Sequence, residues 1–301
     1  MRGIRVLFVL LIVSAVSSCT STPRSAQPGS LRVLAAETFL ADIAQNVAGE
    51  RIHVDALLPQ GMDPHEFQPA PQDAIRIAQS QVLIVNGLGY ETWLTSSLQD
   101  SGGQQLVIVA TRGLSSDPDP TGDHPGGDPH LWMAPLSVVH YVENIRDGLS
   151  QADPDGKAVY AANADAYITR LRDLDASIKS LVAQLPPARR LLVTSHDSLG
   201  YFAQAYGFKV VGAVIPSVTN EASPSAQQMA ALIDTIKSTG APAIFLDPTE
   251  NRNLVQQISS ATGAKVIADL YVESLSPAGG PAATYLDMLR HDASTIVNAL
   301  R

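Results

Sequence analysis

Short runs of β-branched and aliphatic residues recur along this chain, separated by longer stretches with helical periodicity. The apolar runs cover residues 31–36, 54–58, 82–86, 106–110, 191–194, 210–213, 243–246 and 265–267. The helical patterns cover residues 39–48, 71–79, 198–206, 225–238 and 253–262. Strands that alternate with helices pair in parallel, because each connection has to cross the sheet before the next strand begins. The alternation therefore predicts an α/β protein with two βα lobes, each with a mainly parallel sheet.

A long helical pattern separates the two groups of predicted strands. Between residues 155 and 185 apolar side chains recur at helical spacing, with no proline or glycine after Gly156. About 30 residues at 1.5 Å per residue span roughly 45 Å, and Pro186 and Pro187 end the pattern. We expect one long, rigid helix that joins the lobes, with two shorter helices separated by a break as the alternative.

The first nineteen residues have the pattern of an export signal. Arg2 and Arg5 precede an apolar run that ends in small residues at Cys19, the single cysteine of the chain. The run is shorter than the roughly 20 apolar residues of a membrane-spanning helix. We therefore predict a signal peptide over residues 1–18, lipidation of Cys19, and a lipidated tether over residues 19–30.

The rest of the chain is long enough for two domains. We expect an N-terminal lobe over residues 31–150, a linking helix over residues 151–187 and a C-terminal lobe over residues 188–301. The lipid would anchor an exported protein on the outer face of the cytoplasmic membrane or in the periplasm. The formal net charge of -9 argues against nucleic acid as a partner, because phosphate binding needs basic patches. We expect a monomer.

Three histidines, His65, His130 and His196, lie in polar segments next to predicted strands. Ligands of open α/β sheets bind outside the carboxyl ends of the strands. Three imidazoles and one carboxylate complete the tetrahedral shell of zinc. Asp63 and Asp128, each followed by a proline and then a histidine, are candidate acceptors for imidazole N–H groups. These residues leave two interpretations open: shared coordination of a metal ion, or histidines that only cap or hydrogen-bond within loops.

The other histidines carry less weight. A polar loop over residues 115–128 contains His124, which could recruit a metal ion transiently. His53 opens a predicted strand, and His140 and His291 fall in helical stretches. We expect these three side chains to lie at the surface or half-buried.

Several motifs resemble those of the zinc- and manganese-binding solute-binding lipoproteins of ABC importers, the metal-binding-receptor cluster or adhesin-lipoprotein family. They are Gly61-Met62-Asp63-Pro64-His65-Glu66-Phe67, Asn86-Gly87-Leu88-Gly89-Tyr90-Glu91, Asp128-Pro129-His130-Leu131-Trp132, Ser195-His196-Asp197 and Leu270-Tyr271. The resemblance covers essentially the whole chain after the tether. It implies two βα lobes joined by one rigid helix, with a metal site in the cleft between them.

The resemblance also implies a ligand set. His65, His130 and His196 match the family's ligand positions. The fourth ligand is usually the aspartate of a Leu-Tyr-Ser-Asp-Ser-Leu-like stretch, and here that position is Glu273, with Asp269 as the competing carboxylate. The longer glutamate must re-aim its oxygen, or its backbone must withdraw.

The implied function is capture of a metal ion outside the cytoplasm and its delivery to the permease of an ABC importer. The ligand types favour Zn²⁺, and Mn²⁺ is the alternative, because some members of the family with the same ligands serve manganese uptake. A zinc-dependent hydrolase is the rival class. The chain lacks the His-Glu-x-x-His motif of that class, so we expect no enzyme.

Overall fold

The computed structural model describes residues 31–94, 98, 104–119, 126–217, 223–248 and 252–301. The predicted signal peptide, Cys19, the tether over residues 19–30 and His124 lie outside these residues. Residues 31–301 form one compact unit. Within the described part of the chain, no helix has both the length and the apolar character that a membrane span requires.

Two four-stranded parallel sheets form the framework, as predicted. The first contains β1 (Val33–Ala35), β2 (Val54–Ala56), β3 (Val82–Val85) and β4 (Leu106–Val109) in the order β2-β1-β3-β4. The second contains β5 (Leu191–Thr194), β6 (Lys209–Ala213), β7 (Ala243–Phe245) and β8 (Lys265–Ile267) in the order β6-β5-β7-β8. The two lobes therefore repeat one strand order, in which the first strand in sequence lies between the second and the third.

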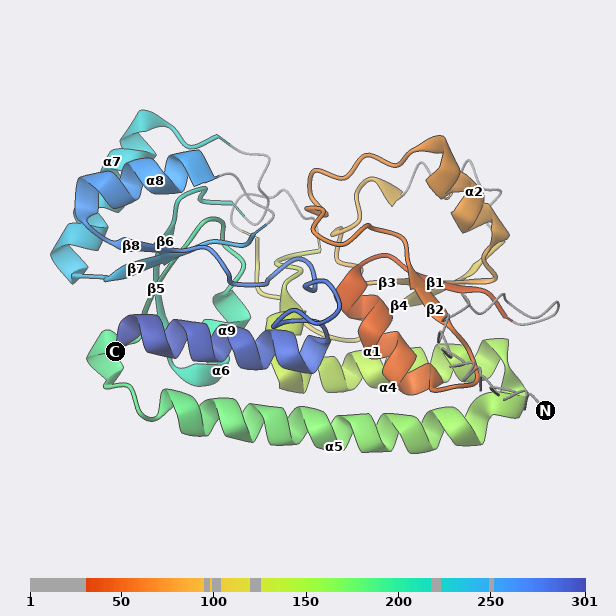
Figure 1. The fold of residues 1–301 in the computed structure, drawn as a ribbon. Coiled ribbons are helices and arrows are strands. Elements are labelled where there is room, and N and C mark those ends of the chain that lie inside the picture. The colour runs from red at the N-terminus through yellow and green to blue at the C-terminus, as the bar shows by residue number, and fades with distance from the viewer. Residues whose placement is uncertain (1–30, 95–97, 99–103, 120–125, 218–222, 249–251) are drawn as a thin grey trace, which may run out of the picture. The chain divides into compact units, whose positions relative to one another are not determined.

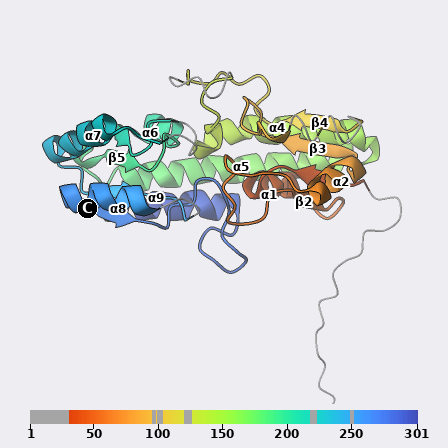
Figure 2. The same cartoon turned by 90° about the horizontal axis from the view of Figure 1, so that it is seen from above.

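Helices cover both faces of each sheet (Figures 1 and 2). They are α1 (Thr38–Ala48), α2 (Pro71–Gln79), α4 (Pro135–Ala152), α5 (Lys157–Val182), α6 (Gly200–Tyr206), α7 (Ala226–Thr239), α8 (Arg252–Thr262) and α9 (Tyr285–Leu300). Short 3₁₀ turns lie at Leu131–Met133, Pro154–Gly156 and Pro187–Arg189. Successive residues of β1, Val33 and Leu34, pack into different apolar clusters, so both faces of the strand are buried.

The predicted linking helix is confirmed as a single helix. α5 contains 26 residues, or about 39 Å at 1.5 Å per residue, and extends below both sheets (Figure 1). Its buried face includes Tyr160, Ala164, Leu171 and Ile178, which recur at helical spacing. α5 is shorter than the sequence pattern, because residues 154–156 form a separate 3₁₀ turn. The predicted boundary between residues 150 and 151 falls inside α4, which ends at Ala152. The limits of the two lobes remain a prediction.

The last helix joins the two halves of the compact unit. α9 follows the second sheet in sequence and contacts its strand β7, but it also packs against α5 and α1. The backbone N–H of Tyr285 donates to Asp42 on α1 at 3.0 Å, and its hydroxyl donates to the carbonyl of Trp132 at 2.6 Å. α9 therefore ties the segment in front of it, residues 268–284, to the first half of the chain.

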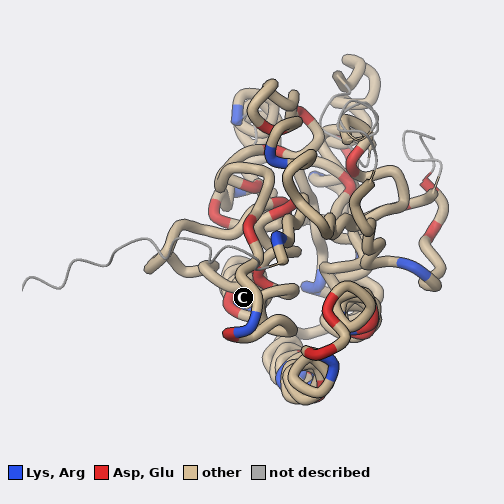
Figure 3. The backbone as a smooth tube through the Cα atoms, turned by 90° about the vertical axis from the view of Figure 1, so that its right-hand side faces the viewer, with Lys and Arg blue, Asp and Glu red and all other residues tan. Residues whose placement is uncertain are grey.

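Charged residues are spread over the chain. The sequence has 20 Lys and Arg residues against 29 Asp and Glu residues, and Figure 3 shows the two kinds interspersed along the backbone. Acidic residues therefore outnumber basic ones in the sequence, but several of them, including Glu37, Glu91 and Asp292, are buried and do not add to the surface charge.

Candidate metal centre

Four of the predicted site residues converge at one point. The candidate ligand atoms of His65, His130, His196 and Glu273 all lie within 4.8 Å of one another. Glu273 Oε1 lies 3.0 Å from Nε2 of His196, 3.3 Å from Nε2 of His130 and 3.9 Å from Nε2 of His65. All four side chains are buried.

The competing carboxylate lies elsewhere. The side chain of Asp269 is 60% exposed, and its Oδ2 lies 3.8 Å from Nε2 of His291, which is not a candidate ligand. Glu273, in contrast, is 0% exposed. The geometry therefore brings Glu273 to the three imidazoles and leaves Asp269 at the surface.

The repeated Asp-Pro-His triplet forms the same turn twice. Asp63 Oδ1 accepts the backbone N–H of His65 at 2.9 Å, and Asp128 Oδ1 accepts the backbone N–H of His130 at 2.9 Å. Such side-chain turns fix the backbone locally. Asp128 Oδ1 also lies 2.8 Å from Nδ1 of His130, so the opposite ring nitrogen, Nε2, faces Glu273. The predicted role of Asp128 as an imidazole acceptor agrees with this geometry.

Tyr90 contacts Glu273, the carboxylate of the site. Tyr90 was not predicted from the sequence as a site residue. Its hydroxyl donates to Glu273 Oε2, and its ring meets the ring of His65 edge-on at 5.1 Å. Burial and the charge of Glu273 raise the pKa of Tyr90 well above its usual value, so the hydroxyl keeps its proton and donates. The motif around Tyr90 was noted in the sequence only as a family marker.

A tight turn delivers Tyr90 to this place. Gly87, Leu88 and Gly89 have φ values of 94°, 60° and 84°, in the left-handed region that favours glycine. A Cβ atom on Gly87 would lie 2.5 Å from Cγ1 of Val109 on the neighbouring strand β4. Glycine at position 87 therefore lets the chain turn closely over the sheet edge.

Trp132 packs against two residues of the site, His130 and Tyr90. Its ring centroid lies 5.0 Å from that of His130, 4.9 Å from that of Tyr90 and 4.6 Å from that of Phe39. It is fully buried, and its Nε1 donates to the carbonyl of Val272 at 2.9 Å. Phe39, Tyr90 and Trp132 are each at most 1% exposed, so this side of the site lies away from solvent, where electrostatic interactions are stronger.

The site holds a buried ion pair. Burial alone would raise the pKa of Glu273, but hydrogen bonds to His130 and His196 outweigh it and hold that pKa well below its usual range. Burial alone would lower the pKa of His130, but hydrogen bonds to Asp128 and Glu273 outweigh it and raise that pKa to about 9. At neutral pH both ring nitrogens of His130 are therefore protonated, and the Nε2 proton faces the carboxylate of Glu273. A metal ion that binds Nε2 has to displace this proton.

Comparison with known proteins identifies the group to which this chain belongs. A family model described as "Zinc-uptake complex component A periplasmic" matches residues 33–299, nearly all of the compact unit. The chain belongs to this family. The resemblance inferred from the sequence motifs is therefore confirmed.

Individual relatives carry different metals in their names. The manganese-binding lipoprotein MntA of Halalkalibacterium halodurans is 33% identical over 295 residues, which cover 98% of this chain and 97% of the relative. The iron-binding protein YfeA of Yersinia pestis is 32% identical over 294 residues, 95% of this chain and 94% of the relative. The solved structure of the periplasmic zinc-binding protein TroA from Treponema pallidum superposes with a TM-score of 0.84 at 27% identity, over 90% of this chain and 99% of that one.

Two further carboxylates lie buried near the site and were not predicted. Burial and the charge of Glu91 raise the pKa of Glu37 well above its usual value. Burial also raises the pKa of Glu91 to about 7, although the backbone N–H groups of Gly87 and Asn86 donate to it. Glu37 follows β1 at the position where His196 follows β5. Glu37 directly precedes α1, and Glu91 belongs to the Asn86–Glu91 motif, but neither position alone predicts a buried carboxylate.

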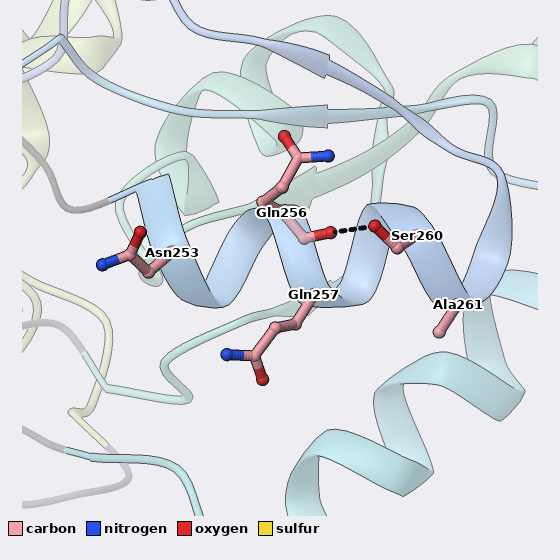
Figure 4. A pocket seen from close by; sticks show the side chains of 5 residues that line it. All are labelled: Asn253, Gln256, Gln257, Ser260 and Ala261. Atoms are coloured by element: carbon pink, nitrogen blue, oxygen red, sulfur yellow. Dashed lines mark hydrogen bonds between the residues drawn. The ribbon is translucent and has the colours of Figure 1, made fainter.

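A separate hollow lies on α8, and none of the four candidate metal ligands lines it. It is lined by Asn253, Gln256, Gln257, Ser260 and Ala261. The side chains point to different sides of the helix, and the Ser260 hydroxyl donates to the Gln256 carbonyl at 2.8 Å (Figure 4). None of these five residues has a charged or imidazole side chain, so the hollow does not resemble a metal site.

Proposed function

We propose that this protein is an extracytoplasmic metal-binding receptor that captures Zn²⁺ and delivers it to the permease of an ABC importer. The observation that carries the proposal is the convergence of three buried imidazoles on one buried carboxylate oxygen. Membership of the zinc-uptake family and the names of the relatives support a metal ion as the ligand. Export and the lipid anchor rest on the sequence pattern of residues 1–30, and the relative MntA, which is named a lipoprotein, supports them.

The choice of zinc rests on how Glu273 is held. Tyr90 binds Glu273 Oε2, which leaves Oε1 facing the three imidazoles. Three nitrogens and one oxygen suit four-coordinate zinc, whereas manganese prefers octahedral sites rich in oxygen. The name of the relative MntA favours manganese as the second candidate.

The same geometry supports binding in preference to catalysis. A catalytic zinc site keeps a coordination position open for water or substrate. Here four protein groups lie together, each with a side chain that is at most 2% exposed. We therefore propose a carrier site, in which the metal ion is cargo.

Competitive titration of the metal-free protein tests this proposal. We expect a single site with an affinity for Zn²⁺ at least about 100-fold higher than for Mn²⁺, because zinc stands above manganese in the Irving–Williams order. Failure to bind either ion would contradict the receptor function. Tighter binding of Mn²⁺ would establish the second candidate. Cells that lack the protein should also take up radioactive zinc more slowly, and the wild-type gene should restore uptake.

Tyr90→Phe is expected to reduce the preference for zinc by about tenfold. Loss of the hydroxyl frees Glu273 Oε2, so the carboxylate gains a second oxygen for the larger coordination shell of manganese. The Zn²⁺ and Mn²⁺ dissociation constants measure the change. Tyr206→Phe is the matched control, because the Tyr206 hydroxyl is buried but contacts Asp175 on α5 at 3.3 Å. An equal change in both variants would disprove the role of Tyr90.

A further inference from the structure

Several hydrogen bonds from the first half of the chain hold the segment that bears Glu273. We call residues 270–276 the carboxylate segment; it has no helix or strand and lies between β8 and α9. Leu275 N–H donates to Thr38 Oγ1 at 2.9 Å, and Gly61 N–H donates to Ser274 Oγ at 2.9 Å. Two side chains donate to carbonyls of the segment: Gln60 to Ser276 at 2.8 Å and Trp132 to Val272 at 2.9 Å.

Three of these contacts come from segments that carry the other candidate ligands. Gln60 and Gly61 lie four to five residues before His65, and Trp132 lies two residues after His130. Thr38 opens α1 at the carboxyl end of β1. The position of the carboxylate segment is therefore coupled to the positions of two histidines.

The second half of the chain holds the same segment through two buried aspartates. Asp247 follows β7 and is 2% exposed. Its Oδ2 accepts the backbone N–H of Val272 at 2.6 Å and that of Glu273 at 3.1 Å. Asp292, on α9 and 0% exposed, accepts the backbone N–H of Tyr271 through Oδ1 at 2.9 Å. Of these two aspartates, Asp247 contacts the backbone of the metal-binding residue itself.

We infer that Asp247 is a positioning residue that sets where Glu273 presents its oxygen and so determines the metal preference of the site. This inference rests on the proposed function. Asp247 fixes the backbone end of Glu273, and Tyr90 fixes Oε2 at the other end. With both ends held, Oε1 is the oxygen that faces the three imidazoles.

The length of glutamate explains why such a hold is needed. Glutamate has one methylene and one rotatable bond more than aspartate, so its oxygens cover more space unless the backbone is fixed. Ligand groups have to be held within about 0.5 Å of the productive geometry for a metal site to be selective. A carboxylate that accepts two adjacent N–H groups holds them more firmly than a neutral acceptor does. Asp247 therefore limits the positions that Glu273 Oε1 can reach.

Asp292 provides a matched control. It is as deeply buried as Asp247 and bonds the same segment, but at Tyr271, two residues before Glu273. Burial raises the pKa of Asp292 well above its usual value, and the charge of Asp247 adds to this effect. Loss of Asp292 therefore disturbs the packing of the segment without releasing the backbone N–H of Glu273.

Asp247→Ala, Asp247→Asn and Asp292→Ala test the inference on the full chain. The readouts are the Zn²⁺ and Mn²⁺ dissociation constants, the visible absorption of bound Co²⁺, and thermal melting of the metal-free protein. We expect Asp247→Ala to weaken Zn²⁺ binding by about 10- to 100-fold and Mn²⁺ binding by less. The intense visible bands of tetrahedral Co²⁺ should weaken as well. Asp292→Ala should lower the melting temperature but change the ratio of the two dissociation constants by less than about threefold.

Asp247→Asn keeps an acceptor oxygen but loses its charge, so we expect an intermediate loss of about three- to tenfold for Zn²⁺. If Asp247→Ala does not fold, Asp247→Asn alone tests whether Asp247 positions Glu273. Unchanged Zn²⁺ affinity and an unchanged Co²⁺ spectrum in Asp247→Asn would overturn the inference, as would equal changes in the Asp247 and Asp292 alanine variants. Wild-type protein that binds no metal would overturn the proposed function itself, which the wild-type titration reports separately.

Discussion

His196→Ala is expected to weaken Zn²⁺ binding by about 100- to 1000-fold. Zinc sites with four protein ligands bind with about 10–16 kcal/mol at neutral pH, so one ligand of four accounts for roughly 2.5–4 kcal/mol, at about 1.4 kcal/mol for each tenfold change. His196 is buried, and its Nε2 lies 3.0 Å from Glu273 Oε1. Competition with a chromophoric chelator measures the change.

His140→Ala is the control for loss of a histidine outside the site. The His140 side chain lies on α4, is 58% exposed and is 3.4 Å from Glu143. We expect its removal to leave the Zn²⁺ dissociation constant unchanged. Wild-type affinity in His196→Ala would remove His196 from the ligand set, and a comparable loss in His140→Ala would show that the assay reports general damage.

The bounds of a strand or helix could be predicted where its apolar pattern ends at the same residue as its regular backbone hydrogen bonding. β5, β8 and α2 have the bounds that the sequence predicts. β2 was predicted to extend to residue 58 but ends at Ala56. Leu57 and Leu58 remain buried, and their N–H groups still donate to the carbonyls of Ala35 and Ala36. Hydrophobicity reports burial, so it does not mark the point at which a regular strand ends.

The four candidate ligands could be proposed because they lie in local motifs that resemble those of a known family, whereas the groups that orient Glu273 do not lie next to it in the sequence. The Asp-Pro-His triplets place His65 and His130 in recognisable turns. Tyr90 and Glu273 are 183 residues apart, and Asp247 and Glu273 are 26 apart. These contacts depend on how the carboxylate segment folds back between the two sheets. No spacing within one element encodes that arrangement, so the sequence could not predict it.

Glu273→Gln is expected to destabilise the metal-free protein by about 3 kcal/mol near pH 6, because removing one partner of a buried ion pair leaves the other charge uncompensated. The amide keeps the size of the side chain but lacks the charge that holds the proton on His130. Zn²⁺ binding should also weaken, because a neutral amide is a poorer ligand for the cation than a carboxylate.

The pH dependence separates this effect from a loss of packing. The folded pKa of His130, about 9, lies above its ordinary value of 6.5, so its contribution is fully present below about pH 6.5 and is lost as the pH rises through about 9. The folded pKa of Glu273 lies below its ordinary value of 4.5. Its contribution is therefore present above about pH 4.5 and is lost as the pH falls through the folded value. The difference between wild type and variant should be largest between about pH 4.5 and 6.5 and should shrink towards pH 9 and above.

Denaturant unfolding of the metal-free proteins from pH 4.5 to 9.5 measures that difference. Asp269→Asn is the matched control, because it removes a carboxylate four residues earlier whose side chain is 60% exposed. An exposed charge contributes little, about 0–1 kcal/mol even when it is paired, so its unfolding curves should follow those of wild type. A destabilisation by Glu273→Gln that stays constant across this range would mean that the variant only loosens packing. A loss that shrinks as His130 gives up its proton would instead tie the stability of the empty site to the proton that an arriving metal ion displaces.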